Sequence, residues 1–273
     1  MLAAITGVLL TVAGCSSSSS ASSSSAAAPS ASVTAPSASV TAAPATSGAA
    51  GASSTSGTSE ATPSASMTPL PAATGQLTGT QLESVLLPAT DFPSGFATPS
   101  TGTITSGGSL TTGPATYNLA TISCATFIQH LGTVGFGETA MVFGGVADSG
   151  QAFDQFIYQF ATPAAASAFV TGIQSLAARC GSFTAQANGS TGTFSLRAAT
   201  GTPVGGHPAL DVAQTGTLAK ERLAVDTLFC ASGVDVFATS GVGANGAAAP
   251  TDPAKQTIVY TLMQRQAAEA VLG

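Results

Sequence analysis

The chain has 273 residues and a net charge of −6, from 6 basic and 12 acidic side chains. So few cations cannot neutralise the phosphates of a nucleic acid, and they form no polybasic segment for anionic lipid. We therefore expect no nucleic-acid partner.

The first fourteen residues are predicted to be a secretory signal peptide. The apolar run from Leu2 to Val12 has the length of a signal core, and it is shorter than the roughly 20 residues that span a membrane. The tetrapeptide Val12–Cys15 resembles a bacterial lipobox, in which the cysteine is acylated before cleavage. This resemblance implies a lipoprotein with palmitate-type chains on Cys15, anchored at the extracytoplasmic face of the cell membrane. A signal peptide normally opens with Lys or Arg, and neither precedes Arg179. We therefore expect the true start to lie upstream.

Residues 15–76 are predicted to be the lipidated cysteine and a disordered linker. The segment is almost wholly Ser, Ala, Thr, Pro and Gly, and Glu60 is its one charged residue. Such a composition buries too little apolar surface to offset the entropy of ordering the chain. It is also typical of O-glycosylated stalks. Residues 77–273 show periodic apolar positions and are long enough for one domain with its own core.

The first elements of this domain alternate between short helices and strands. A helix is predicted over Gln81–Leu87, ended by Pro88, and strands over Phe96–Thr105 and Tyr117–Ile122. Ser123 is suited to cap a further helix that runs through Leu131 and ends at Gly132.

The middle of the domain carries the strongest patterns. Strands are predicted over Thr139–Val146 and Ala152–Phe160, around a turn at 148–150. Aromatic or aliphatic residues occupy both parities of the second strand, which indicates an interior strand covered on at least part of each face. Its aromatic residues could line a pocket, but core packing explains them better. Thr162-Pro163 then begins a helix that ends at Cys180.

The last part is predicted to be a run of antiparallel strands followed by a helix. Asn188-Gly189 is typical of a hairpin, and residues 241–251 are predicted to be a Gly/Ala loop. The final helix begins at Asp252-Pro253 with a buried stripe. The predicted strands are Ser182–Gln186, Thr193–Ala198, Ala209–Thr217, Arg222–Ala231 and Val234–Ser240, and the stripe is Ile258, Val259, Leu262, Met263 and Val271. This order predicts an α+β domain with a mostly antiparallel sheet.

Three patterns resemble the PknH-like extracellular sensor domains and related lipoproteins of high-GC Gram-positive bacteria. They are Leu86-Leu87-Pro88 followed by residues 91–95, the FxTPAAAxAFxxxxxxLxxxC pattern over 160–180, and the strand pair over 222–238 followed by a helix. The resemblance implies a two-layer domain with helices packed on one side of the sheet and no shared catalytic residues. The chain departs from the family in lacking tryptophan before the helix-terminal cysteine.

Three cysteines remain in the domain, so at most one pair can form within it. Cys124 begins one predicted helix and Cys180 ends another, and antiparallel packing of these helices would bring the two together. We favour a Cys124–Cys180 disulfide, with Cys180–Cys230 as the alternative. Cys230 lies in an apolar strand, where a cysteine behaves as a small hydrophobe.

Catalytic candidates are few. The chain contains no GxSxG, HExxH, GxxxxGK[ST] or CxxC motif, and the glycines at 241–246 lack the context of a dinucleotide site. His130, near a helix end, is best explained as structural. His207, with Asp211 four residues on, is the one candidate base for a hydrolase, and no serine stands in a nucleophile setting. Two scattered histidines do not make a metal site, so we expect no metal and no cofactor.

The sequence therefore predicts a lipid-anchored cell-surface lipoprotein with a non-catalytic binding or sensor-like domain. Its partners would be the membrane, through the anchor, and an envelope lipid, glycan or protein. Two alternatives remain: an envelope hydrolase with an unrecognised site, and a structural or assembly lipoprotein that contacts another envelope protein.

Overall fold

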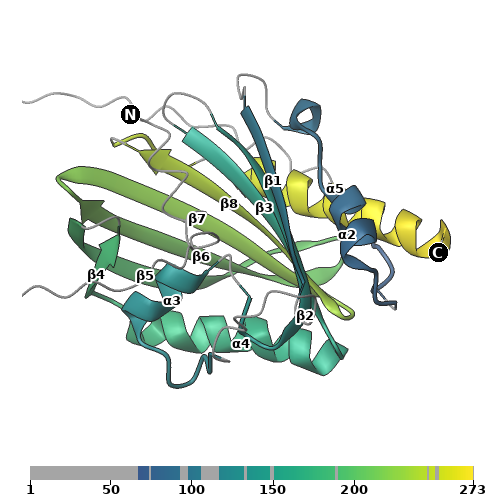
Figure 1. The fold of residues 1–273 in the computed structure, drawn as a ribbon, viewed down its shortest axis with the longest axis horizontal. Helices are drawn as coiled ribbons and strands as arrows, with labels where there is room; N and C mark the ends of the chain where they lie inside the picture. Colours follow the sequence, from purple (N-terminus) through teal and green to yellow (C-terminus); the bar gives the residue numbers. More distant parts are fainter. Residues whose placement is uncertain are drawn as a thin grey trace, which may run out of the picture. The chain divides into compact units, whose positions relative to one another are not determined.

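The computed structural model describes residues 67–73, 75–92, 98–105, 117–131, 134–147, 151–187, 190–244, 246–249 and 252–272. Cys15, the predicted signal peptide and most of the predicted linker lie outside this part. The described residues form an eight-stranded sheet in the order β1-β2-β3-β8-β7-β6-β5-β4, with helices against it (Figure 1). The predicted α+β class and antiparallel sheet are confirmed.

The sheet consists of two antiparallel meanders joined where β3 pairs with β8. Hairpins are favoured because short turns join neighbouring strands, two of them at Gly205-Gly206 and Ala219-Lys220 with positive φ. The strands are β1 (Thr98–Thr105), β2 (Glu138–Ala147), β3 (Gln151–Phe160), β4 (Phe183–Ala187), β5 (Ser190–Val204), β6 (His207–Leu218), β7 (Glu221–Ser232) and β8 (Asp235–Ala244).

The helices begin where the sequence provides caps. Thr78 forms a capping box at α2 (Gly79–Val85), and Ser123 caps α3 (Cys124–His130). Thr162 caps α4 (Pro163–Arg179), with proline at its first position. A short 3-10 turn, η2 (Ala89–Asp91), follows α2, and α5 (Asp252–Leu272) ends the described chain. None of the described helices is long and apolar enough to cross a membrane.

Helices cover both faces of the sheet, so the predicted two-layer arrangement with helices on one side is wrong. We call the face packed by α2 and α5 the α5 face, and the face packed by α3 and α4 the α4 face. The cause is visible in β3, where Phe153 and Ile157 join the core of the α5 face while Phe156 and Tyr158 join that of the α4 face. Each face therefore has apolar surface to bury. The β3 aromatic residues are core residues, as predicted.

The predicted strand over Tyr117–Ile122 is wrong. Asn118 turns the chain here, because its side-chain Oδ1 accepts the Ala120 N–H at 2.8 Å and its carbonyl accepts the Ile122 N–H at 2.8 Å. Such local side-chain hydrogen bonds compete with sheet pairing.

The predicted loop over 241–251 begins too early, because residues 241–244 belong to β8. There the backbone pairs with β3 on one side and β7 on the other. Glycines in a buried strand between two neighbours resemble a loop in sequence, but their backbone groups are satisfied by the ladder. At the far end of α5, Val271 is 84% exposed and is not part of the buried stripe.

Residues 67–73, which we call the strap, pack along the turns at one end of the sheet. The Leu70 N–H bonds to the Gly205 carbonyl at 3.0 Å, and the Ala73 carbonyl accepts the Val234 N–H at 3.3 Å. Gly233 has φ +62° and lies against the Ala73 carbonyl, where a Cβ would collide. The sequence placed these residues in the linker, but they are part of the folded unit, because their backbone bonds to the hairpin turns.

Candidate ligand-binding trough

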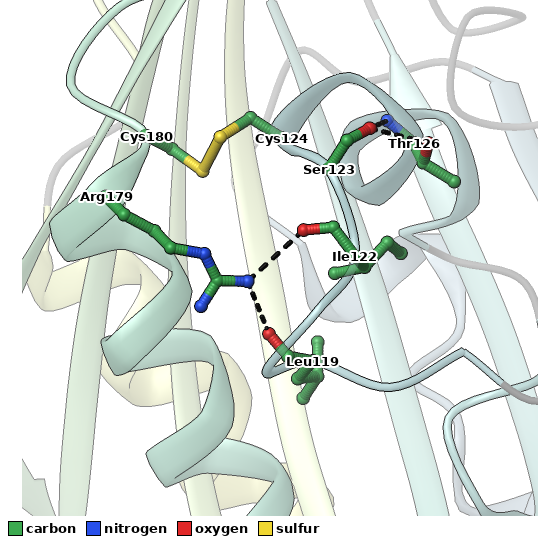
Figure 2. Close-up of a disulfide and its surroundings, with 7 residues drawn as sticks. All are labelled: Leu119, Ile122, Ser123, Cys124, Thr126, Arg179 and Cys180. Carbon is green, nitrogen blue, oxygen red and sulfur yellow. Dashed lines mark hydrogen bonds between the residues drawn. A yellow bond between two sulfur atoms is a disulfide. The ribbon is translucent and has the colours of Figure 1, made fainter.

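The Cys124–Cys180 disulfide is present, as the sequence favoured, and the alternative pairing with Cys230 is not formed. It joins the start of α3 to the end of α4, with a Cα–Cα distance of 5.7 Å. Beside it, Arg179 donates to the Leu119 and Ile122 carbonyls at 2.8 and 3.2 Å (Figure 2). The disulfide and Arg179 together fix the segment that precedes α3.

Cys230 is buried in β7 on the α5 face. Burial raises the pKa of the Cys230 thiol to about 12, so the thiolate that a nucleophile requires is absent at neutral pH. Cys230 is a core residue.

His207, the candidate base, holds the strap. Its ring Nε2 lies 3.0 Å from the Leu70 carbonyl, to which it donates, and 3.5 Å from Ser232 Oγ. Asp211, its imagined partner, is ion-paired with Lys255 at 3.2 Å. The structure therefore does not bring Ser, His and Asp together in the order that a hydrolase requires.

We expect His207→Ala to leave hydrolysis of generic ester and peptide substrates unchanged from wild type. The variant should instead lose about 1 kcal/mol of unfolding free energy with the strap hydrogen bond, and exchange strap amides faster in hydrogen-exchange measurements. His130→Ala is the control and should leave strap exchange unchanged. A hydrolytic rate that is present in wild type and lost in His207→Ala would contradict this assignment.

His130 is structural, at the end of α3. Tyr117 Oη lies 3.0 Å from its Nε2, and the two rings are 4.4 Å apart. Burial lowers the pKa of His130, so the ring is neutral at physiological pH.

A buried lysine organises the start of α5. Lys255 Nζ lies 3.2 Å from Asp211, 2.6 Å from Asp226 and 3.1 Å from Asp252, and its own side chain is 0% exposed. The carboxylate oxygens of these three aspartates lie within 4.8 Å of one another. The Lys255 ammonium group occupies the position that a metal ion would take in such a cluster. It therefore offsets part of the negative charge of the three aspartates.

The charges of this cluster depend on one another. Burial by itself would lower the pKa of Lys255, but its hydrogen bonds and proximity to the aspartates raise it, so Lys255 is charged. Burial raises the pKa of Asp211, and the neighbouring aspartates add to that rise, while Lys255 opposes it. The carboxylates of this cluster therefore depend on the Lys255 ammonium group to offset their mutual repulsion.

Asp154 and Asp235 are also buried, and neither forms an ion pair within the part of the chain that the structure describes. Asp154 in β3 has one oxygen without a hydrogen-bond partner in the described part, and Asp235 in β8 accepts from Gln266 Nε2 at 2.7 Å. Burial raises the pKa of each from 3.8 to about 7. Both groups therefore titrate near neutral pH in the folded state and near pH 4 in the unfolded chain.

We expect the protein to become more stable as the pH falls from 8 to 5. The folded state holds these protons more tightly than the unfolded state, so the cost of burying the two carboxylates disappears on protonation. Between about pH 4 and pH 7 each group changes stability by up to about 1.4 kcal/mol per pH unit, and above pH 7 this dependence levels off because both states are deprotonated. Urea unfolding at several pH values tests this. Asp154→Asn and Asp235→Asn should each flatten the profile, Asp91→Asn should not, and a flat wild-type profile would contradict it.

The α5 face is not fully covered by helices. Strands β5, β6 and β7 continue past the start of α5, and Figure 1 shows their ends with β4 on the side away from that helix. A trough of about 600 Å³ lies there. Its residues are Ser182, Thr193, Phe194, Ser195, Thr215, Gly216, Thr217, Arg222, Leu223, Ala224 and 246–248.

The floor of the trough is a ladder of hydroxyl groups. Thr193 pairs with Thr217, and Ser195 pairs with Thr215. The alternation of β-strands places these four side chains on one face, and Ser195 Oγ lies 2.9 Å from Thr215 Oγ1. Arg222 in β7 stands opposite Thr217 in the next pair. The trough thus offers hydrogen bonds and a positive charge.

No residue of the trough was predictable as a ligand contact from the sequence. The available signal was the repetition of Ser or Thr at every second position in two predicted strands, with an arginine at the start of the next. Such alternation is equally typical of an ordinary solvated sheet face. The uncovered end of the sheet becomes visible once the length of the strands and the position of α5 are known.

No family model and no curated protein matches the chain. Among solved structures, it is similar to the extracellular domain of PknH from Mycobacterium tuberculosis, with 18% identity, a TM-score of 0.49, and coverage of 71% of this chain and 98% of that one. The residues of this chain alone therefore define the candidate site.

Proposed function

We propose that the protein is a membrane-anchored, extracytoplasmic binding or sensor-like module that holds a polar ligand in the trough and does no chemistry on it. The observation that carries this is the trough itself: about 600 Å³ over a ladder of hydroxyls with an exposed arginine. Binding sites of this kind measure roughly 300–1,000 Å³ and carry a few convergent polar groups.

The arrangement of reactive groups supports binding over catalysis. His207 is occupied by the strap, Cys230 is a buried thiol, and Lys255 is enclosed by three carboxylates. A large exposed apolar patch would instead indicate an assembly role. Among the described residues, Val271 is the one large hydrophobic side chain that is exposed.

The location rests on Cys15 and on the lipobox-like residues before it. Acyl chains on Cys15 would hold the module at the outer face of the membrane, since two or more chains anchor stably where one binds weakly. Intact mass measurement of the protein purified from membranes tests this, with Cys15→Ala as the control. We expect acylated Cys15 at the mature N-terminus, and loss of membrane association in the variant.

Binding at the trough can be tested by hydrogen exchange, with and without a detergent extract of the producing cell's envelope. We expect slower exchange in β5, β6 and β7 around the trough and unchanged exchange in β1 and β2. Thr215→Leu, which fills the floor with an apolar side chain, should abolish the protection. Unchanged exchange in β5–β7 with wild type would refute the trough as the binding site.

A further inference from the structure

We propose that the ligand of the trough is an anionic, hydroxyl-rich molecule, namely a sugar or polyol that carries a phosphate group. This inference rests on the proposed binding function and adds the chemistry of the ligand.

The chain has six basic side chains, not counting histidine. Three of them have structural roles. Arg179 donates to the carbonyls before α3, Arg265 donates to the Val85 and Ser84 carbonyls at the end of α2, and Lys255 is ion-paired with three aspartates. These cations are occupied by the fold.

The remaining three cations gather around the trough. Arg222 lines it, Lys220 lies in the β6–β7 turn beside it, and Arg197 lies on the same face of β5, two residues from Ser195. All three are exposed, and within the described chain none has an ion pair or a side-chain hydrogen bond. In an acidic protein, this places all the uncommitted positive charge in one region.

Nearby acidic groups do not cancel this charge. Glu221 precedes Arg222 in β7, so strand alternation points it to the opposite face. Asp211 and Asp226 lie farther along the α5 face and are ion-paired with Lys255, at 3.2 and 2.6 Å. An anion in the trough therefore meets cations that have no closer partner. A guanidinium group suits phosphate in particular, because it donates two parallel hydrogen bonds to two phosphate oxygens.

The hydroxyl ladder indicates the rest of the ligand. Thr193, Ser195, Thr215 and Thr217 can each donate and accept a hydrogen bond, which matches the hydroxyl groups of a sugar or polyol. On this face the floor presents hydroxyls and Ala224, whereas the neighbouring Phe194 is buried in the sheet. Ser195 and Thr215 would keep their mutual hydrogen bond under an apolar ligand, but the Thr193 and Thr217 hydroxyls would not gain a partner, at a cost of about 1–3 kcal/mol for each one fully desolvated.

The test measures binding of the full chain by isothermal titration calorimetry. The probes are glucose 6-phosphate and myo-inositol 1-phosphate, with neutral glucose and myo-inositol as references. Vesicles of phosphatidylcholine with and without phosphatidylinositol distinguish a lipid headgroup from a soluble phosphate. We expect at least one phosphate-bearing probe to bind at least tenfold more tightly than its neutral counterpart. Arg222→Gln should weaken that binding at least tenfold, and binding should weaken with added salt.

The matched control is Glu221→Gln, which changes the charge one residue away on the opposite face and should change affinity less than twofold. Binding confined to phosphatidylinositol vesicles would identify a lipid source, and binding of the soluble probes a free one. Equal affinity for phosphorylated and neutral probes, no binding of any phosphate probe, or an unaffected Arg222→Gln variant would overturn the ligand assignment. If the envelope extract still protects the trough in that case, the proposed function stands without this ligand class.

Discussion

We expect the double variant Cys124→Ala/Cys180→Ala to unfold with about 4 kcal/mol less free energy than wild type. The disulfide closes a loop across a sequence separation of 56 residues, and in the chain-entropy model a loop of this length stabilises by about 4 kcal/mol, because it restricts the unfolded chain. The effect should be large in this domain, since the bond also holds α3 to the end of α4. Urea unfolding followed by circular dichroism measures it.

The matched control for the disulfide is Cys230→Ala. This cysteine is as buried as Cys180 but makes no covalent bond, so its loss should cost about 1 kcal/mol, for the small cavity that it leaves. Reductant should destabilise wild type and Cys230→Ala equally, and should leave the double variant unchanged. A double variant as stable as wild type would mean that packing of α3 and α4 suffices without the bond.

Replacing Lys255 by methionine should lower the free energy of unfolding by about 3 kcal/mol at pH 7. Removing one partner of a buried ion pair typically costs about 3–5 kcal/mol, because the other charge loses its compensation. The lower end applies here, because the Asp211 and Asp226 side chains are 22% and 26% exposed and keep part of their hydration. The start of α5 should separate from β6 and β7 first.

The pH dependence of Lys255→Met distinguishes lost charge from lost packing. Without the ammonium group, the three aspartates repel one another and bind protons more readily in the folded state. The deficit relative to wild type should therefore shrink as the pH falls from 7 to 5. Adding Asp226→Asn should recover part of the loss at pH 7. Lys220→Met is the matched control, and as an exposed residue it should change stability by less than about 0.5 kcal/mol. A deficit that does not change with pH would contradict the electrostatic account.

The sequence predicted most elements of the fold because their signals are local. Ser123 and Thr162 cap helices by side-chain hydrogen bonds to residues three positions on, and the two parities of β3 reflect a strand covered on both faces. The arrangement of helices was not predictable in this way. The parity of Phe153 and Ile157 indicated a second covered face, but the family resemblance implied helices on one side.

The errors within the domain arise from tertiary context. Residues 241–244 resemble a loop by composition and form a strand because β3 and β7 satisfy their backbone from both sides. Tyr117–Ile122 has strand composition, but Asn118 and Arg179 bond to its backbone groups and hold a turn. The hydrogen bonds of β8 and of Arg179 join residues far apart in the sequence, and the local bonds of Asn118 add to those of Arg179.

The candidate site shows the same difference between local signals, which the sequence displays, and tertiary contacts, which it does not. Cys124 and Cys180 could be paired from the sequence, because each marks the end of a predictable helix. His207 was singled out by residue type, but its partner is the Leu70 carbonyl, 137 residues away in sequence. The trough depends on where α5 stops covering the sheet, and the role of Lys255 depends on three aspartates from two strands and a helix.

The measurement that bears most directly on the binding function is native mass spectrometry of the protein purified from its own membrane in mild detergent. Wild type should carry an additional non-covalent mass that collisional activation removes, and Thr215→Leu should lack it. A substitution on the exposed surface of α4, Ser167→Leu, should retain it. Two results would contradict the proposal that this protein holds its ligand in the trough. One is a wild-type protein detected without any bound molecule, and the other is a Thr215→Leu variant that carries the same bound molecule as wild type.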